Sequence, residues 1–270
     1  GILDTDEQSC QSYSYTGSDI LVTAPENAVG LKVKIWGAGG GHEIRTGAPA
    51  GSGGYTYAEF DSALITEGAV FTLVVGEGGN RFTPSNGSTY GFGGSGSHDM
   101  GGGLSGVFSG DQTVLETEKV RALAIAGGGA GMDHDGGSPL SASYAGGTNG
   151  NSPGTSGGES SMKGSTDSQA LCGSSTTSGR PRIFYSTGGG GYEGGGRGNY
   201  EVQVPTTGSS PSVGCPTNIA SGYGGSGFVH PSAIFQSIQA SPNGVDIPPN
   251  TDDSDYISTV GIAGPDVHYN

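Results

Sequence analysis

The sequence predicts an all-β protein with almost no α-helix, in which strands continue directly into extended glycine segments. Glycine provides 57 of the 270 residues. Its runs lack the one-in-three spacing of collagen and are separated by apolar segments typical of strands. Residues 31 to 36, LKVKIW, alternate apolar and polar side chains as a half-buried strand does, and then continue into Gly-Ala-Gly-Gly-Gly. The strand and the glycine run therefore form one continuous unit, and the rest of the chain repeats this arrangement.

The same succession recurs along the chain, and each occurrence predicts one strand. Residues 121 to 126 alternate Leu or Ile with Ala, so this segment has no polar face and reads as a central strand buried on both sides. DILVTA and YEVQV are further strand-like segments without a following glycine run. The strand-to-glycine junctions are FTLVVG (71 to 76) before EGG, VRALAIA (120 to 126) before GGGAG, and RIFYST (182 to 187) before GGGGYEGGGRG; SGYGGSG (221 to 227) precedes FVHPSAIF in the reverse order.

So many glycines are costly to order, because fixing each backbone costs about 1–2 kcal/mol and glycine has no side chain whose burial could offset it. The backbone itself must supply the compensation. Polyproline-II-like helices of glycine can lie side by side and hydrogen-bond to one another, since no Cβ separates them. We therefore expect a bundle of polyglycine-II helices joined to the strands. Flexible glycine loops on a β-sandwich are the alternative.

Residues 13 to 41, YSYTGSDILVTAPENAVGLKVKIWGAGGG, resemble the opening of the glycine-rich domain family. GGYTYAEFD, FTLVVGEGG, ALAIAGGGAG, GGGGYEGGGRG and GGSGFVHPS resemble its later landmarks in the same order, and the likeness covers about residues 11 to 264. The family occurs in bacterial, phage and protist surface proteins and in the extracellular part of anaplastic-lymphoma-kinase-like receptors. The resemblance implies a TNF-like β-sandwich of jelly-roll type joined to the glycine bundle, with a binding or structural role.

The expected organisation has three parts: an N-terminal extension (1 to 12), a glycine-rich domain (13 to 235) and an irregular C-terminal tail (236 to 270). Acidic residues outnumber basic ones 25 to 10, and the basic residues form no stripe, so nucleic-acid binding is not expected. No apolar run approaches the length of a membrane span. An acidic, Ser/Thr-rich and Lys-poor composition suits an extracellular or cell-surface protein.

Catalytic motifs are weak, so we expect no enzyme and no required cofactor. GTSGG at residues 154 to 158 fits the nucleophile pattern G-x-S-x-G but lacks the strand before it and the helix after it. Two acidic clusters place carboxylates in loops as Ca²⁺ ligands require, although plain solvated turns are the simpler explanation. The candidate calcium ligands are Asp133 and Asp135 in one cluster and Asp252, Asp253 and Asp255 in the other.

Covalent modification is expected at three positions. In an oxidising compartment Cys172 and Cys215 are the expected disulfide, since both lie in Ser/Thr/Pro-rich connections; three unrelated thiols are the alternative. Cys10 would then be free or would pair between chains. Asn86 begins the only glycosylation sequon with an allowed middle residue, NGS.

Two functional classes remain. The first is a non-catalytic subunit of an extracellular filament, hair, sheath or coat, assembled as a homopolymer through its terminal segments. The second is an adhesin or ligand-binding module that would contact a cell-surface receptor or glycan with loops at the tips of the glycine helices. We favour the structural reading. The residues expected to make assembly contacts are Ile2, Leu3, Cys10, Ile257, Val260 and Ile262.

Overall fold

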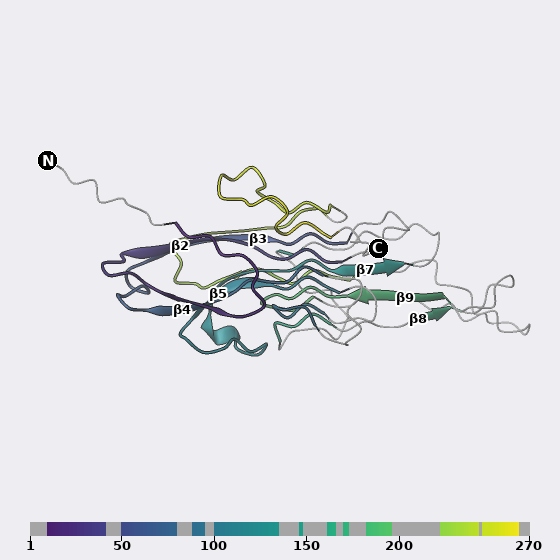
Figure 1. Ribbon diagram of the computed structural model, residues 1–270, viewed down its shortest axis with the longest axis horizontal. Coiled ribbons are helices and arrows are strands. Elements are labelled where there is room, and N and C mark those ends of the chain that lie inside the picture. The colour runs from purple at the N-terminus through teal and green to yellow at the C-terminus, as the bar shows by residue number, and fades with distance from the viewer. Residues whose placement is uncertain are drawn as a thin grey trace, which may run out of the picture.

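The computed structural model describes residues 10–41, 50–79, 88–94, 100–134, 146–147, 161–165, 170–172, 182–195, 222–242 and 245–264. Within these residues the chain is nearly all β (Figure 1), and its helical content is one three-residue 3₁₀ turn, η2 (Lys119–Arg121). The strands are β1 (Ile20–Thr23), β2 (Gly30–Trp36), β3 (Tyr55–Asp61), β4 (Val70–Val74), β5 (Ser105–Ser109), β6 (Ala122–Ala126), β7 (Gly131–His134), β8 (Ala170–Cys172), β9 (Arg182–Thr187), β10 (Phe228–Val229) and β11 (Phe235–Gln239).

The strands form three antiparallel sheets. One has five strands in the order β1-β4-β5-β6-β10, a second has the order β11-β3-β2, and a third has the order β7-β9-β8. Every strand pair in them is antiparallel. β2 pairs with β3 along its whole length, from Gly30 opposite Asp61 to Trp36 opposite Tyr55.

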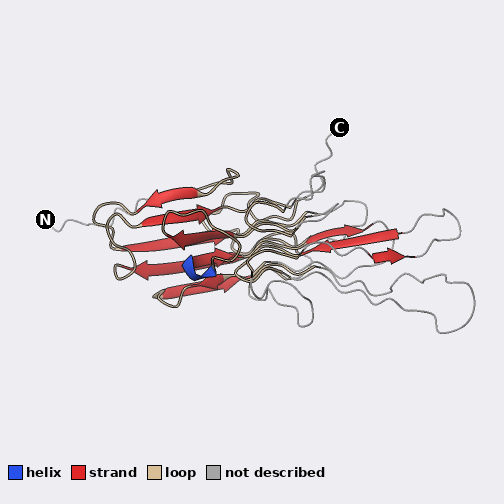
Figure 2. Cartoon of the chain, turned by 90° about the horizontal axis from the view of Figure 1, so that it is seen from below, coloured by secondary structure: helices blue, strands red, loops and turns tan. Residues whose placement is uncertain are grey.

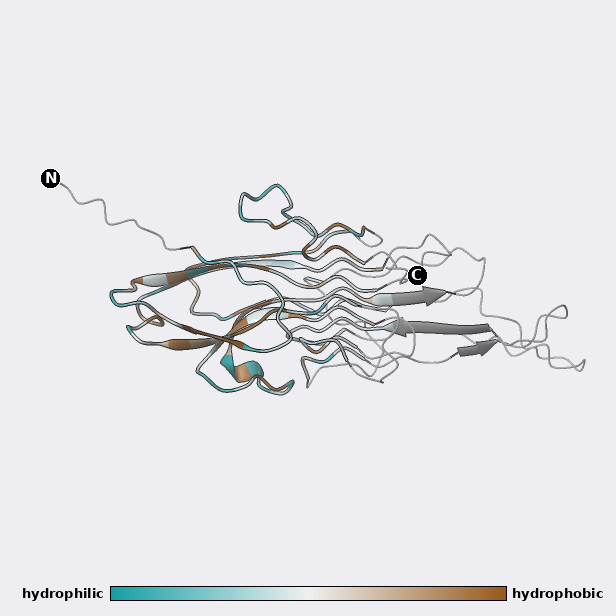
Figure 3. Ribbon diagram, viewed as in Figure 1, coloured by the Kyte–Doolittle hydropathy of each residue, from teal (hydrophilic) through white to brown (hydrophobic). Residues whose placement is uncertain are grey.

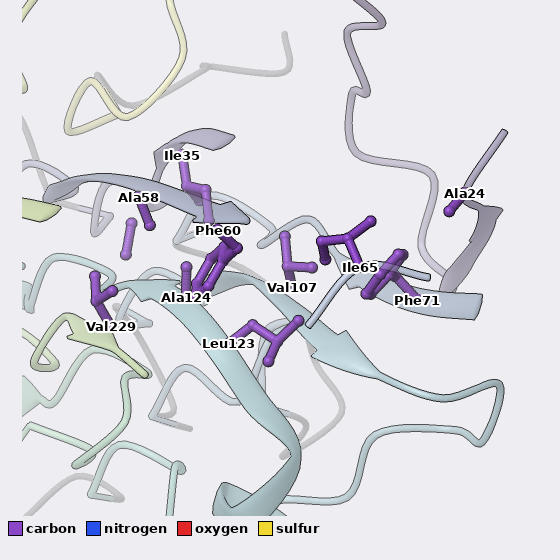
Figure 4. Packing of buried hydrophobic residues seen from close by; sticks show 11 residues of the cluster. Ala24, Ile35, Ala58, Phe60, Ile65, Phe71, Val107, Leu123, Ala124 and Val229 are labelled. Carbon is purple, nitrogen blue, oxygen red and sulfur yellow. The ribbon is translucent and has the colours of Figure 1, made fainter. Parts of the chain in front are cut away.

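The first two sheets pack face to face around the main hydrophobic core (Figure 4). Ile35 and Phe60 reach this core from the three-stranded sheet, while Phe71, Val107 and Leu123 reach it from the five-stranded sheet. Phe60 is 2% exposed, and burying a side chain of this size stabilises the fold by about 2–3 kcal/mol. In β2 the odd positions that the alternation assigned to the core are indeed inside, and Lys32 and Lys34 face outward.

The opposite face of the five-stranded sheet is covered by loops. Phe108 and Ile125 belong to a second buried cluster there, together with Met162, and Tyr90 and Tyr192 pack against it. β6 supplies side chains to both clusters, and all five of its residues are buried. The expectation of a central strand without a polar face is therefore confirmed at β6. Residues 120 and 121, which the pattern included in this strand, belong to η2.

Beyond the two packed sheets, the chain runs as extended segments that lie side by side and lead to the β7-β9-β8 sheet (Figure 2). These segments contain most of the described glycines, and in Figure 3 they are nearly white, whereas the strongly apolar colour appears on stretches of the packed sheets. We call them the glycine layer: residues 37–41, 50–54, 76–79, 91–94, 100–104, 127–130, 146–147, 188–195 and 222–227.

The C-terminal part of the chain is also joined to this body. The expected domain boundary after residue 235 falls inside β11, which pairs with β3 from Phe235 opposite Glu59 to Gln239 opposite Tyr55. Further on, Gly264 forms a parallel bridge with Gly41, and the Gly264 N–H donates to the Gly40 carbonyl over 3.0 Å. The described residues between 236 and 264 therefore pack on the sheets and on the glycine layer. The segment YEVQV lies outside the described residues.

Candidate functional site

The centre of the glycine layer is the segment that follows β6, residues 127–130. The Gly128 N–H donates to the Gly190 carbonyl over 2.7 Å, and the Gly129 N–H donates to the Ala38 carbonyl over 2.9 Å. Its own carbonyls accept from three further segments: Gly127 from Gly54, Gly128 from Gly225, and Gly129 from Gly102, over 2.8 to 2.9 Å. Five neighbouring segments thus form hydrogen bonds with the backbone of residues 127–130 without forming a sheet or a helix.

Hydrogen-bond partners in the layer recur at every third residue. The N–H groups of Gly37 and Gly40 both donate to the segment 51–54, at distances of 2.9 Å. Those of Ala38 and Gly41 both donate to the segment 100–103, at distances of 3.0 Å. In a helix with three residues per turn, every third residue faces the same neighbouring segment. Successive residues therefore face different neighbours, and each segment can contact several others.

Only glycine fits at the central positions. A Cβ built on Gly127, Gly128 or Gly129 would lie 1.9, 2.1 or 1.8 Å from a carbonyl oxygen of the adjacent segment. Gly78 differs, because a Cβ there would meet only one atom, at 4.0 Å. Gly127, Gly128 and Gly129 are therefore interior positions, at which any side chain would collide with a neighbouring segment.

A second feature joins β2 to the C-terminal segment through charge. The Lys34 ammonium binds Asp253 Oδ1 at 2.8 Å and Asp255 Oδ2 at 2.6 Å. Hydrogen bonds from Lys34 are the main cause of a lowered pKa at Asp253, and the Asp255 backbone N–H contributes to it. The same two hydrogen bonds, with Asp253 first, raise the pKa of Lys34. Both groups therefore remain charged over a wide pH range.

Trp36, at the end of β2, adds an aromatic contact to this joint. Its indole Nε1–H donates to the Pro249 carbonyl over 3.1 Å. Its ring lies 4.9 Å from that of Tyr55 and 5.5 Å from that of Tyr256, measured between centroids. We call the set Lys34, Trp36, Asp253, Asp255 and Tyr256 the C-terminal clamp. It fastens residues 245–264 onto β2.

The sequence indicated the acidic cluster but not its partner. Lys34 and Asp253 are 219 residues apart, so no local pattern connects them. The available signals were a lysine on the outward face of a strand and an indole at its end, both of which commonly find partners. The outer face of the same sheet also carries Tyr57, whose hydroxyl donates to the Glu59 carboxylate, and this bond raises the pKa of Tyr57 to about 12.

The candidate calcium ligands are distributed as follows. Asp253 and Asp255 bind Lys34, while Asp252 is exposed beside them. Asp133 lies in β7, and Asp135 lies outside the described residues. Among the described residues no group of three or more His, Cys, Asp or Glu side chains is placed to hold a metal ion. A calcium ion at the C-terminal cluster would have to compete with the Lys34 ammonium for two carboxylates.

The remaining predicted site residues fall partly outside the described ranges. Asn86, Cys215, Ile2 and Leu3 lie outside them, and Cys172 is the last residue of β8. Cys10 is exposed and unpaired within the described part of the chain. Ile257 is exposed, whereas Val260 and Ile262 are partly buried in the docked C-terminal segment. In the described residues no helix has the length and apolar character needed to cross a bilayer.

These observations define a class of β-proteins in which packed sheets continue into a layer of hydrogen-bonded glycine segments. The chain belongs to the glycine-rich domain family: the family's model matches residues 15–245. A search of curated proteins finds no match. The resemblance noted in the sequence is thereby confirmed.

Proposed function

We propose that this protein is a non-catalytic structural subunit of an extracellular filament, hair, sheath or coat, and that it assembles as a homopolymer through its terminal segments. The observation that carries the proposal is the glycine layer, whose central segment exchanges backbone hydrogen bonds with five neighbours. Backbone groups paired on all sides make a stiff body with few sites of local opening. Stiffness of this kind suits a building block.

In this proposal the extended segments of the layer are polyglycine-II helices and the two packed sheets are a TNF-like jelly roll. The three-residue recurrence of partners from Gly37 to Gly41 supports the helices, because polyproline-II geometry has three residues per turn. The face-to-face packing of two antiparallel sheets supports the sandwich. The detailed jelly-roll topology is inferred from the family.

The test of function is the oligomeric state of the full chain. Size-exclusion chromatography with light scattering, over a range of protein concentrations, and negative-stain electron microscopy should show filaments or long oligomers. Deleting residues 1 to 9 should leave a folded monomer that no longer assembles, since none of these residues belongs to the described sheets. A full-length chain that stays monomeric at high concentration would favour the adhesin, which can be screened against surface receptors and glycans.

The extracellular location has its own test. Mass spectrometry of an unreduced digest should find Cys172 joined to Cys215, a pairing that closes a long loop and stabilises by about 4 kcal/mol on the chain-entropy model. Alkylation of both thiols without prior reduction would remove this pair, and with it part of the argument for an oxidising compartment.

A further inference from the structure

In the part of the chain that the structure describes, the strand β11 is a free edge of the three-stranded sheet. β11 and β2 are the two outer strands of the three-stranded sheet. β2 carries Lys32 and Lys34 and lies beside the docked C-terminal segment, whereas β11 has the sequence FQSIQ and no charge. Charges, prolines or covering segments are the usual means of preventing strand addition at such edges. Among the described residues, no backbone hydrogen bond reaches β11 from the side opposite β3.

The register identifies which groups of β11 face outward. The Ile234 N–H donates to the Glu59 carbonyl over 2.8 Å, and Phe235 is the register partner of Glu59, so the Glu59 backbone faces β11. Backbone groups alternate sides along a strand. Those of Phe235, Ser237 and Gln239 therefore face β3, and those of Gln236 and Ile238 face away. Next to them the side chains of Ile234 and Phe235 are 63% and 57% exposed.

We propose that this edge accepts residues 1–9 of a second copy of the chain as an added β-strand. The proposal rests on the structural function proposed above and names its acceptor. The nine residues GILDTDEQS precede the exposed Cys10 and can span about 30 Å when extended, so they can cover all five residues of β11. Ile2 and Leu3 supply apolar side chains for the exposed Ile234 and Phe235. Because β11 carries no negative charge, it would not repel Asp4, Asp6 and Glu7.

The sheet topology explains why such an exchange would continue from copy to copy. Residues 10–19 lead into β1, which is one edge of the five-stranded sheet, while the other edge, β10, contacts β11. Donor and acceptor thus belong to opposite edges of the molecule. A contact between two different surfaces is heterologous, so it propagates as a ring or filament. An acceptor on the donor's own edge would instead favour a closed dimer.

The proposal is tested in the full chain with Gln236→Pro and its matched control Gln236→Ala. Proline removes the outward N–H and places its ring at the edge, but β3 makes no use of that N–H, so the fold is retained. Thermal melting of both variants checks the fold. Gln236→Ala should assemble as the unchanged protein does. Gln236→Pro should elute as a monomer.

A mixing experiment provides the second test and does not depend on the proline variant alone. A donor-defective chain, Ile2→Asp with Leu3→Asp, mixed with Gln236→Pro should give a one-to-one dimer by light scattering, because each copy keeps one working half of the contact. A synthetic GILDTDEQS peptide should block assembly of the unchanged chain, and a scrambled peptide should not.

The outcomes separate this inference from the proposed function. If the unchanged chain assembles but Gln236→Pro assembles equally well, or if the mixture gives no dimer, the acceptor is not β11 and the inference is wrong while the function stands. If the unchanged chain does not assemble, the proposed structural function is wrong, and strand addition at β11 is wrong with it.

Discussion

At the scale of single residues, Gly128 shows how little space the glycine layer leaves. A methyl group there would lie 2.1 Å from the Gly102 carbonyl oxygen. The Gly128 N–H donates a hydrogen bond to the Gly190 carbonyl. Gly128→Val should lower the free energy of unfolding by about 3 kcal/mol or more, through overpacking and broken hydrogen bonds. Chemical denaturation measures the change. Gly78→Val is the matched control, since a Cβ at Gly78 has open space; equal losses in both variants would contradict tight packing at Gly128.

The C-terminal clamp makes a second residue-scale prediction, and Trp36 is the only tryptophan of the chain that can report on it. Lys34→Met removes the partner of Asp253 and Asp255, leaving two adjacent carboxylates that repel each other. Residues 249–256 should then detach from β2, and Trp36 fluorescence should shift to longer wavelength as its contact with Tyr256 is lost. Lys32→Met, at an exposed lysine two residues away, should leave the emission unchanged.

The pH dependence of the clamp follows from the two shifted groups. The folded-state pKa of Asp253 lies below its ordinary value of 3.8, so its stabilisation is present above pH 3.8 and is lost as the pH falls through the folded pKa. That of Lys34 lies above 10.5, so its contribution is fully present below pH 10.5 and is lost at higher pH. Trp36 emission should therefore stay constant between these limits and change below the lower one. In Lys34→Met this acid transition should be absent.

At the scale of elements, β6 and the segment 127–130 form one continuous buried unit. Every residue from Ala122 to Ala130 is buried, although only the first five belong to a strand. Exchange with solvent requires opening that breaks hydrogen bonds to several neighbours at once. We expect the amides of Gly128 and Gly129 to exchange with deuterium as slowly as those of β6. Native-state hydrogen exchange measures this, and rapid exchange at these glycines alone would instead identify a flexible loop.

The strands also show which parts of the structure could be predicted from the sequence. Alternation in LKVKIW and the Leu/Ile-Ala pattern of residues 121 to 126 predicted strands and their faces, because both depend on neighbours along the chain. Residues 236 to 239 of β11 fall in the segment expected to be an irregular tail, because FQSIQ places polar residues on both faces of the strand and therefore has no clear period of two. The Lys34 contacts were equally invisible, because they join residues that only the folded chain brings together. Interior glycines could be predicted, but not which carbonyl each would contact.

At the scale of the whole molecule, the most direct observable is the proportion of strand, polyproline-II and helical backbone. The described residues contain strands, extended glycine segments and a 3₁₀ turn of three residues. Far-ultraviolet circular dichroism should accordingly show β and polyproline-II signals and almost no α-helical contribution. A spectrum dominated by helix would contradict the fold.

The direction of the glycine segments has a mechanical consequence. They run along the long axis of the molecule beside one another, continuing the strands of the packed sheets (Figures 1 and 2). Their hydrogen bonds cross from segment to segment, as those from 127–130 to 38, 54, 102, 190 and 225 do. Tension applied along the axis therefore loads many of these bonds together in shear, so that they cannot fail one after another. Tension applied across the axis would peel the segments apart in sequence. The molecule should accordingly be strong in one direction and weak in the other.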